Sequence, residues 1–330
     1  METSTSYLGM RLPHPFIAGA SPFGHRLDSV KRLEDAGWAA VVLHSLFEEQ
    51  ITADHDGCIR HMDPTDPLFA EELGYFPRDN DYPLGPDAYA EHISRLKRSV
   101  AIPIIGSLNG TASESWLTFA RVIEQAGADA LELNLYEVVT NLAMSAAAVE
   151  HRFAGVVKEL KQIVNIPIAV KVSPYFTSFG NMARQFDDAG ADAIVLFNRF
   201  YQSDIDIKTM EPIVSVALSN SSELRLRLRW LAILHGRLRA SLAVSGGVST
   251  PDDGIKAILA GADVVQIVSA LLRHGPTHLD AMRQGLERYM AWHHFDRLEE
   301  ARGRASLERV ADTESFERAQ YIRTLQSWLT

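Results

Sequence analysis

The chain has 330 residues, of which 46% are hydrophobic and 22% are charged, proportions typical of a soluble globular protein with a sizeable core. Its formal net charge of −10 argues against a nucleic-acid or anionic-membrane surface, and its single cysteine excludes a disulfide framework, a cysteine-rich zinc site or an iron–sulfur cluster held by this chain alone. No stretch approaches the roughly 18 apolar residues of a membrane span, and the polar start is no signal peptide. We therefore expect a cytoplasmic enzyme with no nucleic-acid partner, no membrane partner and no metal site.

Apolar runs alternate with helical patterns along the chain, and one phrase recurs where a helix ends and an apolar run begins. The phrase is Ala-Gly-Ala-Asp or a close variant. Glycine ends the helix at this joint, and a strand that is apolar throughout is buried on both faces, as in a parallel sheet. The joints lie at residues 36–39, 126–129, 189–192 and 260–263. The predicted strands are 16–20, 39–44, 102–107, 130–134, 166–172, 193–197, 242–245 and 264–268.

Eight parallel strands with helices between them predict an α/β fold, the (β/α)8 TIM barrel. Residues 7–12 predict a small N-terminal hairpin that closes the bottom of the barrel. We expect one domain over residues 1–330, with the barrel proper at about 15–275 and a C-terminal helical extension at 276–330. A doubly wound sheet is the alternative, and it is less favoured because the joints continue evenly to Val268 and the phosphate-type turn comes last rather than first.

Three long segments interrupt the alternation, and each follows a predicted strand, where a barrel keeps its chemistry. Residues 47–85 are acidic and rich in turn residues, and we interpret them as a lid over the top. The other two segments are 136–145 and 199–222, the latter with a predicted hairpin that includes residues 201–206. In the helical extension, packing anchors are expected at the aromatic residues Trp292, Phe316, Tyr321 and Trp328.

The stretch 242–275 predicts a phosphate site. One apolar run breaks at Gly246 and Gly247, and the next ends at Val268 and Ser269. In a (β/α)8 barrel the loops after the seventh and eighth strands form such a site, because exposed backbone amides at a helix N-terminus attract a dianion. The alternative, that the two glycines serve only a tight turn, stays open.

Polar residues end several predicted strands. Lys171 ends the fifth, and since a lysine is seldom buried alone it either pairs with an acid or faces a ligand, where it stabilises an anionic cofactor or forms a Schiff base. Asn134 and Asn198 end the fourth and sixth strands, and His44 ends the second beside Ser45. Loop capping is the alternative for the asparagines, and an ordinary polar role is the alternative for His44.

Six stretches, in a fixed order up to about Pro276, carry a resemblance to a known family: YLGMRLPHPFIAGASPFG, VVLHSLFEEQI, LELNL, IPIAVKVSPYF, AGADAIVLFNRFYQSDID and SGGVSTPDDGIKAILAGADVVQIVSALLRHG. In these the chain resembles the dihydroorotate dehydrogenase family of flavin mononucleotide (FMN) enzymes, and more narrowly its dihydroorotate dehydrogenase-like branch. The resemblance implies FMN at the top of the barrel, and for members that make orotate it implies pyrimidine biosynthesis. The implied phosphate-binding residues are Gly246, Gly247, Val268 and Ser269. The other implied cofactor contacts are Ala20, Ser21, Ser45, Asn134, Phe197 and Lys171, the last of which neutralises the reduced ring.

The part of the site that binds substrate departs from the family pattern. Members that oxidise dihydroorotate have a Cys or Ser base in the loop where this chain has Glu137, which could also be a solvated loop residue. A lysine normally stands at the position of His44, and a small polar residue at that of Arg199. The catalytic candidates are Glu137, Lys171, His44 and Tyr136, and the substrate-binding candidates are His44, Asn134, Asn198 and Arg199.

The predicted function is an FMN-dependent oxidoreductase acting on a CH–CH bond, with hydride passing between flavin N5 and a small polar or acidic substrate other than dihydroorotate. One alternative is an authentic dihydroorotate dehydrogenase with an unusual base. A second is a phosphate-binding barrel lyase or isomerase in which Lys171 forms an imine, and a third is a binding protein without chemistry. The sequence specifies neither the electron acceptor nor whether the chain forms a homodimer.

Overall fold

The computed structural model describes residues 1–47, 85–109, 113–199, 204–213, 217–308 and 310–327. The predicted lid at 47–85 lies almost entirely outside the described residues. Among the described residues, no helix is both long enough and apolar enough to cross a membrane.

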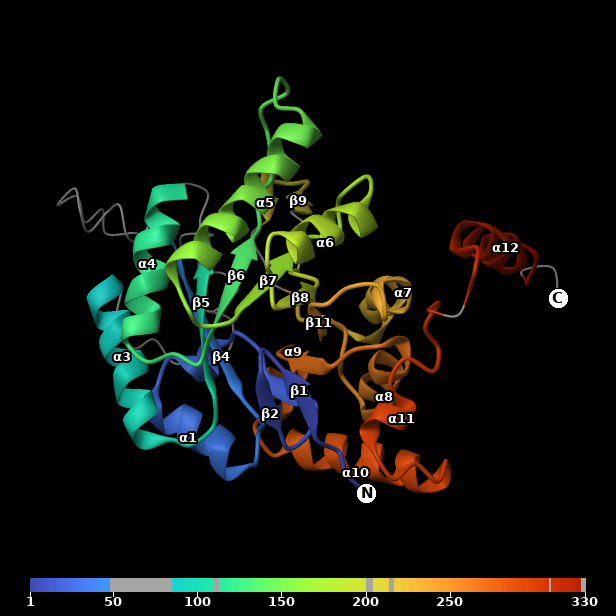
Figure 1. Ribbon diagram of the computed structural model, residues 1–330, viewed down its shortest axis with the longest axis horizontal. Helices are drawn as coiled ribbons and strands as arrows, with labels where there is room; N and C mark the ends of the chain where they lie inside the picture. The colour runs from blue at the N-terminus through green and yellow to red at the C-terminus, as the bar shows by residue number, and fades with distance from the viewer. Residues whose placement is uncertain (48–84, 110–112, 200–203, 214–216, 309, 328–330) are drawn as a thin grey trace.

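Eight parallel strands close into a barrel in the order β11-β12-β3-β4-β5-β6-β7-β8 (Figure 1). The predicted (β/α)8 barrel is thus confirmed, and the doubly wound alternative is wrong. The strands are β3 (Phe16–Ala18), β4 (Val41–Phe47), β5 (Ile104–Asn109), β6 (Ala130–Leu135), β7 (Ile168–Val172), β8 (Ala193–Leu196), β11 (Ser241–Ser245) and β12 (Val264–Ile267).

One strand differs from its prediction in a way that moves a candidate residue. The second barrel strand, β4, was expected to end at His44, but it continues to Phe47. Its register against β5 shifts between Val42 and Ser45, an irregularity that lies around His44. His44 therefore lies within the strand rather than at its end, because pairing with β5 resumes at Ser45.

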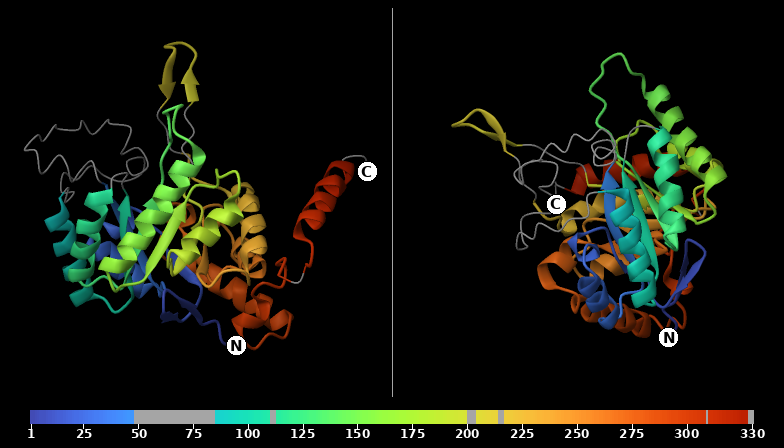
Figure 2. Two further views of the ribbon diagram at one scale, coloured as in Figure 1. Left: turned by 45° about the horizontal axis from the view of Figure 1, so that its top comes forward. Right: turned by 90° about the vertical axis from the view of Figure 1, so that its left-hand side faces the viewer.

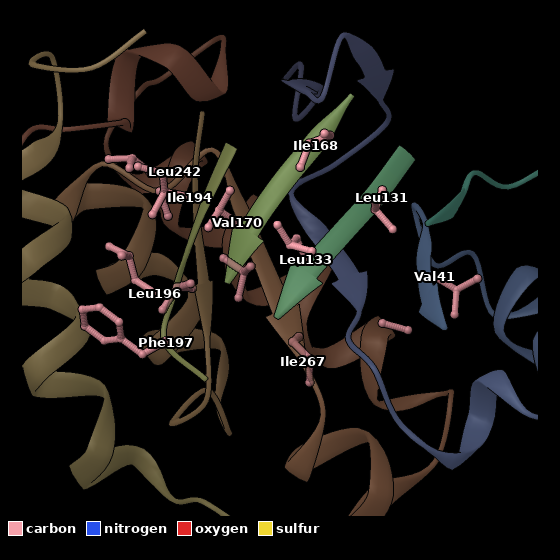
Figure 3. Close-up of a cluster of buried hydrophobic side chains, with 14 of the residues drawn as sticks. Val41, Leu131, Leu133, Ile168, Val170, Ile194, Leu196, Phe197, Leu242 and Ile267 are labelled. Carbon is pink, nitrogen blue, oxygen red and sulfur yellow. The ribbon is translucent and has the colours of Figure 1, made fainter. Parts of the chain in front are cut away.

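Helices surround the barrel and supply the outer half of its core. They are α1 (Leu27–Asp35), α3 (Pro86–Ser99), α4 (Ser113–Gln125), α5 (Ala146–Ile163), α6 (Phe179–Asp188), α7 (Leu224–Leu234), α8 (Pro251–Ala260) and α9 (Ser269–His274). Side chains such as Leu133, Val170 and Ile194 point from the strands into the layer beneath the helices, as Figure 3 shows. Apolar area buried in this way is the main favourable term in folding.

The recurrent joint has a double structural role. Its glycines have positive φ angles of 87° at Gly37, 93° at Gly127, 98° at Gly190 and 118° at Gly261, so each ends its helix in the left-handed conformation. In the joints at Gly127, Gly190 and Gly261 an aspartate follows, and it accepts a backbone hydrogen bond from the neighbouring strand. For example, Oδ2 of Asp192 accepts a 2.7 Å bond from the Ile168 amide.

An N-terminal hairpin of β1 (Thr5–Tyr7) and β2 (Met10–Leu12) forms as predicted. Tyr7, Leu8 and Leu12 are fully or almost fully buried, and they pack against the small apolar residues inside the barrel, such as Ala169 and Ala243. The hairpin therefore closes the end of the barrel opposite the carboxyl ends of the strands.

The C-terminal extension is helical, with α10 (His278–Trp292), α11 (Leu298–Ala301) and α12 (Thr313–Gln326). The last helix, α12, stands away from the barrel and has no buried residue (Figures 1 and 2). Trp292 is 79% exposed and Tyr321 is 52% exposed, so the expectation that these two anchor the extension is wrong. Trp328 lies outside the described residues. A second hairpin, β9 (Asp204–Asp206) with β10 (Glu211–Ile213), rises beyond the barrel, and residues 201–203 of its predicted range lie outside the described residues.

Candidate active site

A cavity of about 180 Å³ lies at the carboxyl ends of the barrel strands. In a TIM barrel this is the end at which ligands bind. The lining residues are Ala20, Ser21, Pro22, His44, Ser45, Asn109, Asn134, Lys171, Phe197, Asn198, Arg199, Leu218, Ser219, Arg227, Ser245, Gly246, Val268, Ser269 and Leu272. The structure thus brings most of the predicted site residues around one cavity, although the strands that carry them are far apart in the sequence.

One wall of the cavity is a hydrogen-bonded group of three side chains from adjacent strands. Nδ2 of Asn134 donates to the hydroxyl oxygens of Ser45 and Ser107, at 2.9 Å each. The two hydroxyls lie 2.8 Å apart. These contacts fix the orientation of the Asn134 amide, so the wall presents preorganised polar groups to a ligand.

The floor holds a buried charge pair. Nζ of Lys171 donates to Oε1 of Glu132 at 3.1 Å, and Nε2 of Gln266 donates to Oε2 of the same carboxylate at 2.6 Å. The Glu132 side chain is 1% exposed and that of Lys171 is 9% exposed. Lys171 combines the two roles that its sequence position suggests, because it pairs with an acid and also lines the cavity.

His44 belongs to a cluster of aromatic rings beside this floor. Its ring stacks on His25 with the ring centres 3.9 Å apart, and Tyr89 meets it edge-on at 5.1 Å. Burial, with His25 and His92 close by, holds the pKa of His44 well below its ordinary value. Its Nδ1 is buried and has no hydrogen-bond partner in the part of the chain that the structure describes, so one nitrogen of this neutral ring is unpaired.

Across the barrel from the wall formed by Ser45, Ser107 and Asn134, one end of the cavity lies between β11 and β12. Gly246 and Gly247 have φ angles of 85° and 79°, a conformation that favours glycine. The amide of Gly247 donates to the Ser219 hydroxyl at 3.2 Å, and that hydroxyl lies 2.8 Å from Ser269 Oγ. Gly246, Val268 and Ser269 line the cavity, but Gly247 does not, because its amide turns towards Ser219.

Two predicted catalytic residues are not among the lining residues of the cavity. Glu137 forms an ion pair with Arg152, and both side chains are partly exposed. Tyr136 lies next to it on the same segment and is also absent from the lining. The interpretation of Glu137 as the base thus has no support from its position, because the path of its loop places it outside the cavity.

Several lining or supporting residues were missed by sequence reasoning. Asn109 ends β5, so the rule that polar strand ends face the site could have found it. Glu132 and Gln266 lie inside strands that look apolar, and their partners are remote in sequence. Arg227 is one of three alternating arginines in α7, with nothing local to single it out.

Comparison with known proteins assigns the chain to a family. The family model described as dihydroorotate dehydrogenase matches residues 82–290, more than half of the chain. The chain belongs to the dihydroorotate dehydrogenase family. Membership places it among oxidoreductases that act on CH–CH bonds, which confirms the predicted enzyme class.

Full-length relatives agree with this assignment. The chain is 23% identical to the NAD-dependent dihydropyrimidine dehydrogenase subunit PreA of Escherichia coli (strain K12), over 97% of this chain and 80% of that protein. It is 27% identical to the catalytic subunit of dihydroorotate dehydrogenase B (NAD(+)) of Thermoplasma volcanium, over 92% of this chain and 98% of that protein. It is 26% identical to the corresponding subunit of Methanothermobacter thermautotrophicus, over 91% of this chain and 97% of that protein.

Proposed function

We propose that the chain binds FMN in the cavity and uses it to oxidise or reduce a CH–CH bond of a small polar or acidic substrate other than dihydroorotate. The observation that carries the proposal is the layout of the cavity. It has a cation, Lys171, on its floor, a fixed amide, Asn134, on its wall, and glycine and serine at the end between β11 and β12.

The residues present fit this cofactor. The Ser21 hydroxyl lines the cavity and is buried without a hydrogen-bond partner among the described residues, as expected of a group awaiting a ligand. A Cβ at Gly246 would lie 2.7 Å from Arg227, so only glycine leaves this end open. Serine hydroxyls and a guanidinium are donors suited to a phosphate.

Bound FMN would supply a two-electron acceptor or donor at its N5 atom. Lys171 would hold positive charge close to the ring system, and Asn134 would bind a ring edge with an amide already oriented by Ser45 and Ser107. The Lys171 ammonium, in this partly buried site, would stabilise negative charge on a reduced ring.

The substrate would lie beside His44, Asn198 and Arg199. A guanidinium fork suits a carboxylate or a polar ring, which supports a small acidic or polar substrate. Of the three, His44 is the residue that can accept and return a proton, and its buried Nδ1 has no hydrogen-bond partner among the described residues.

The lyase alternative is less well supported. Its nucleophile would be Lys171, whose amine is engaged by the buried carboxylate of Glu132. An imine-forming lysine needs an amine that is free to attack a carbonyl, whereas the Lys171 amine is occupied as a donor to Glu132.

The test is the visible spectrum of the purified full-length protein, followed by mass spectrometry of the released ligand. Flavin absorption bands with a released mass of FMN support the proposal. A colourless protein that takes up no FMN on incubation contradicts it. Substrate class is then tested by anaerobic bleaching of the flavin with a panel of small cyclic and acidic compounds that carry a CH–CH bond.

A further inference from the structure

Arg227 is a buried arginine on α7 that faces the cavity at the end between β11 and β12. It is 6% exposed and lines the cavity together with Gly246, Ser219 and Ser269. Its neighbours in the alternating series, Arg225 and Arg229, are not lining residues. Arg229 is half exposed and pairs with Glu317 at 2.6 Å.

Backbone carbonyls hold the Arg227 guanidinium in place. Its Nε donates to the Ser245 carbonyl at 2.5 Å, and its Nη1 donates to the Glu223 carbonyl at 2.7 Å. Nη2 makes no hydrogen bond within the described ranges. A Cβ added at Gly246 would lie only 2.7 Å from it. The unused donor edge of the guanidinium is therefore beside Gly246 and the cavity.

The charge of Arg227 lacks a carboxylate partner. No Asp or Glu oxygen lies within 4.0 Å of its nitrogens among the described residues, and the carboxylate of Glu223 is paired with Arg199 instead, at 3.8 Å. Burial lowers the pKa of the guanidinium, although an arginine remains protonated at neutral pH. A buried cation without a counter-ion is costly, so an anionic ligand at this end would be strongly favoured.

We propose that Arg227 is the cation that recognises the phosphate of the cofactor, and that it makes the cavity selective for FMN over riboflavin. This inference rests on the proposed binding of FMN. The subsite consists of the Arg227 guanidinium, the Ser219 and Ser269 hydroxyls and the backbone at Gly246. The segment that carries Ser219 is held by Arg273, which donates to the Ser219 carbonyl at 2.9 Å.

The test compares the dissociation constants of FMN and riboflavin for flavin-free full-length protein, measured by quenching of flavin fluorescence. Riboflavin lacks only the phosphate, so the ratio of the two constants isolates the subsite. We expect Arg227→Met to weaken FMN binding by about 10- to 100-fold and to change riboflavin binding by less than about threefold. The matched control is Arg229→Met on the exposed side of the same helix, which should leave both constants unchanged.

Two further variants keep the inference testable if Arg227→Met does not fold. Arg227→Gln retains hydrogen-bonding capacity without the charge and should lose the preference for FMN. Arg227→Lys retains the charge and should keep most of that preference. An equal loss of affinity for FMN and riboflavin, or no loss for either, overturns the inference but does not contradict the proposed function. Failure of the unaltered protein to bind either flavin contradicts the proposed function itself.

Discussion

The ammonium group of Lys171 lies 3.1 Å from one carboxylate oxygen of Glu132, at the floor of the cavity. The other oxygen of Glu132 is held by Gln266. Because both side chains are buried, their charges act strongly on a bound ligand, and they act with opposite sign. The electrostatic potential at a bound cofactor should therefore depend on both residues.

The two members of this pair should shift the reduction potential of bound flavin in opposite directions. Lys171→Met removes the cation and leaves a buried anion, so we expect the potential to fall by on the order of 30 to 70 mV. Glu132→Gln removes the anion and should raise it. Potentials are measured by titration against a reference dye in the FMN-loaded protein. Shifts of the same sign in both variants would show that Lys171 has a structural role only.

Stability should fall in acid because of His14. Its Nδ1 accepts from the Phe16 amide at 3.3 Å and its Nε2 donates to the Gly37 carbonyl at 2.9 Å, a pattern that only the neutral ring satisfies. Burial lowers the pKa of His14 to about 4, against an ordinary 6.5. The unfolded chain therefore binds the proton more readily, and stability present above pH 6.5 is lost as pH falls towards 4.

Between pH 7 and pH 5, protonation of this single group in the unfolded chain should lower the free energy of unfolding by about 2 kcal/mol. The measurement is urea unfolding at the two pH values. His14→Asn keeps an acceptor near the Phe16 amide without a titrating ring, so its pH-dependent loss should be smaller than that of the unaltered protein by about this amount. Substitution of the exposed His293 by Asn is the control, and a His14→Asn variant with an undiminished loss would contradict the assignment.

Arg199 should bind the acidic part of the substrate, in competition with Glu223. Arg199→Ala should raise the KM or dissociation constant of a carboxylate ligand by about tenfold or more, since a charge-assisted hydrogen bond is lost. Glu223→Gln should lower it, because Arg199 would lose its 3.8 Å partner. Perturbation of the flavin spectrum by small carboxylates measures both. An unchanged KM or dissociation constant in Arg199→Ala would remove that residue from the site.

His44→Ala should lower kcat more than it raises KM.

The fold was predictable because its signals are local. The glycine of each joint marks the end of a helix, and a strand such as β7 is apolar in nearly every position. The partner of the joint aspartate was not predictable, because Asp192 binds the Ile168 amide and Lys161 on elements that only the closed barrel brings together.

The candidate site was predictable where it consists of strand ends. Asn134 and Ser269 are near one another because the carboxyl ends of parallel strands meet at one end of a barrel. Arg227 could not be recognised, because it points to the side of the helix opposite Arg225 and Arg229, and only the folded chain shows which side is buried. Sequence alone left two interpretations of Glu137 open, a base and a solvated loop residue, because a loop sequence does not specify the path of the loop.

Dihydroorotate should be a poor substrate. Its oxidation requires a base that takes a proton from C5 while hydride leaves C6, and a correctly placed base contributes roughly 10²–10⁴-fold. Glu137, which the resemblance to the family places at the position of the base, is paired with Arg152 and is not among the lining residues of the cavity. His44 lines the cavity, but burial lowers its pKa well below the ordinary value, which makes it a weak base towards a carbon acid.

Stopped-flow reduction of the FMN-loaded protein by dihydroorotate under anaerobic conditions decides the question. We expect bleaching that is slower than typical enzymatic rates, which are on the order of 10 per second, by a factor of about 10² or more. Glu137→Gln should leave this slow rate unchanged, since Glu137 does not reach the cavity, whereas His44→Ala should lower it further. Fast bleaching in the unaltered protein that is abolished by Glu137→Gln would show that the loop moves Glu137 into the cavity and that the chain oxidises dihydroorotate with a carboxylate base.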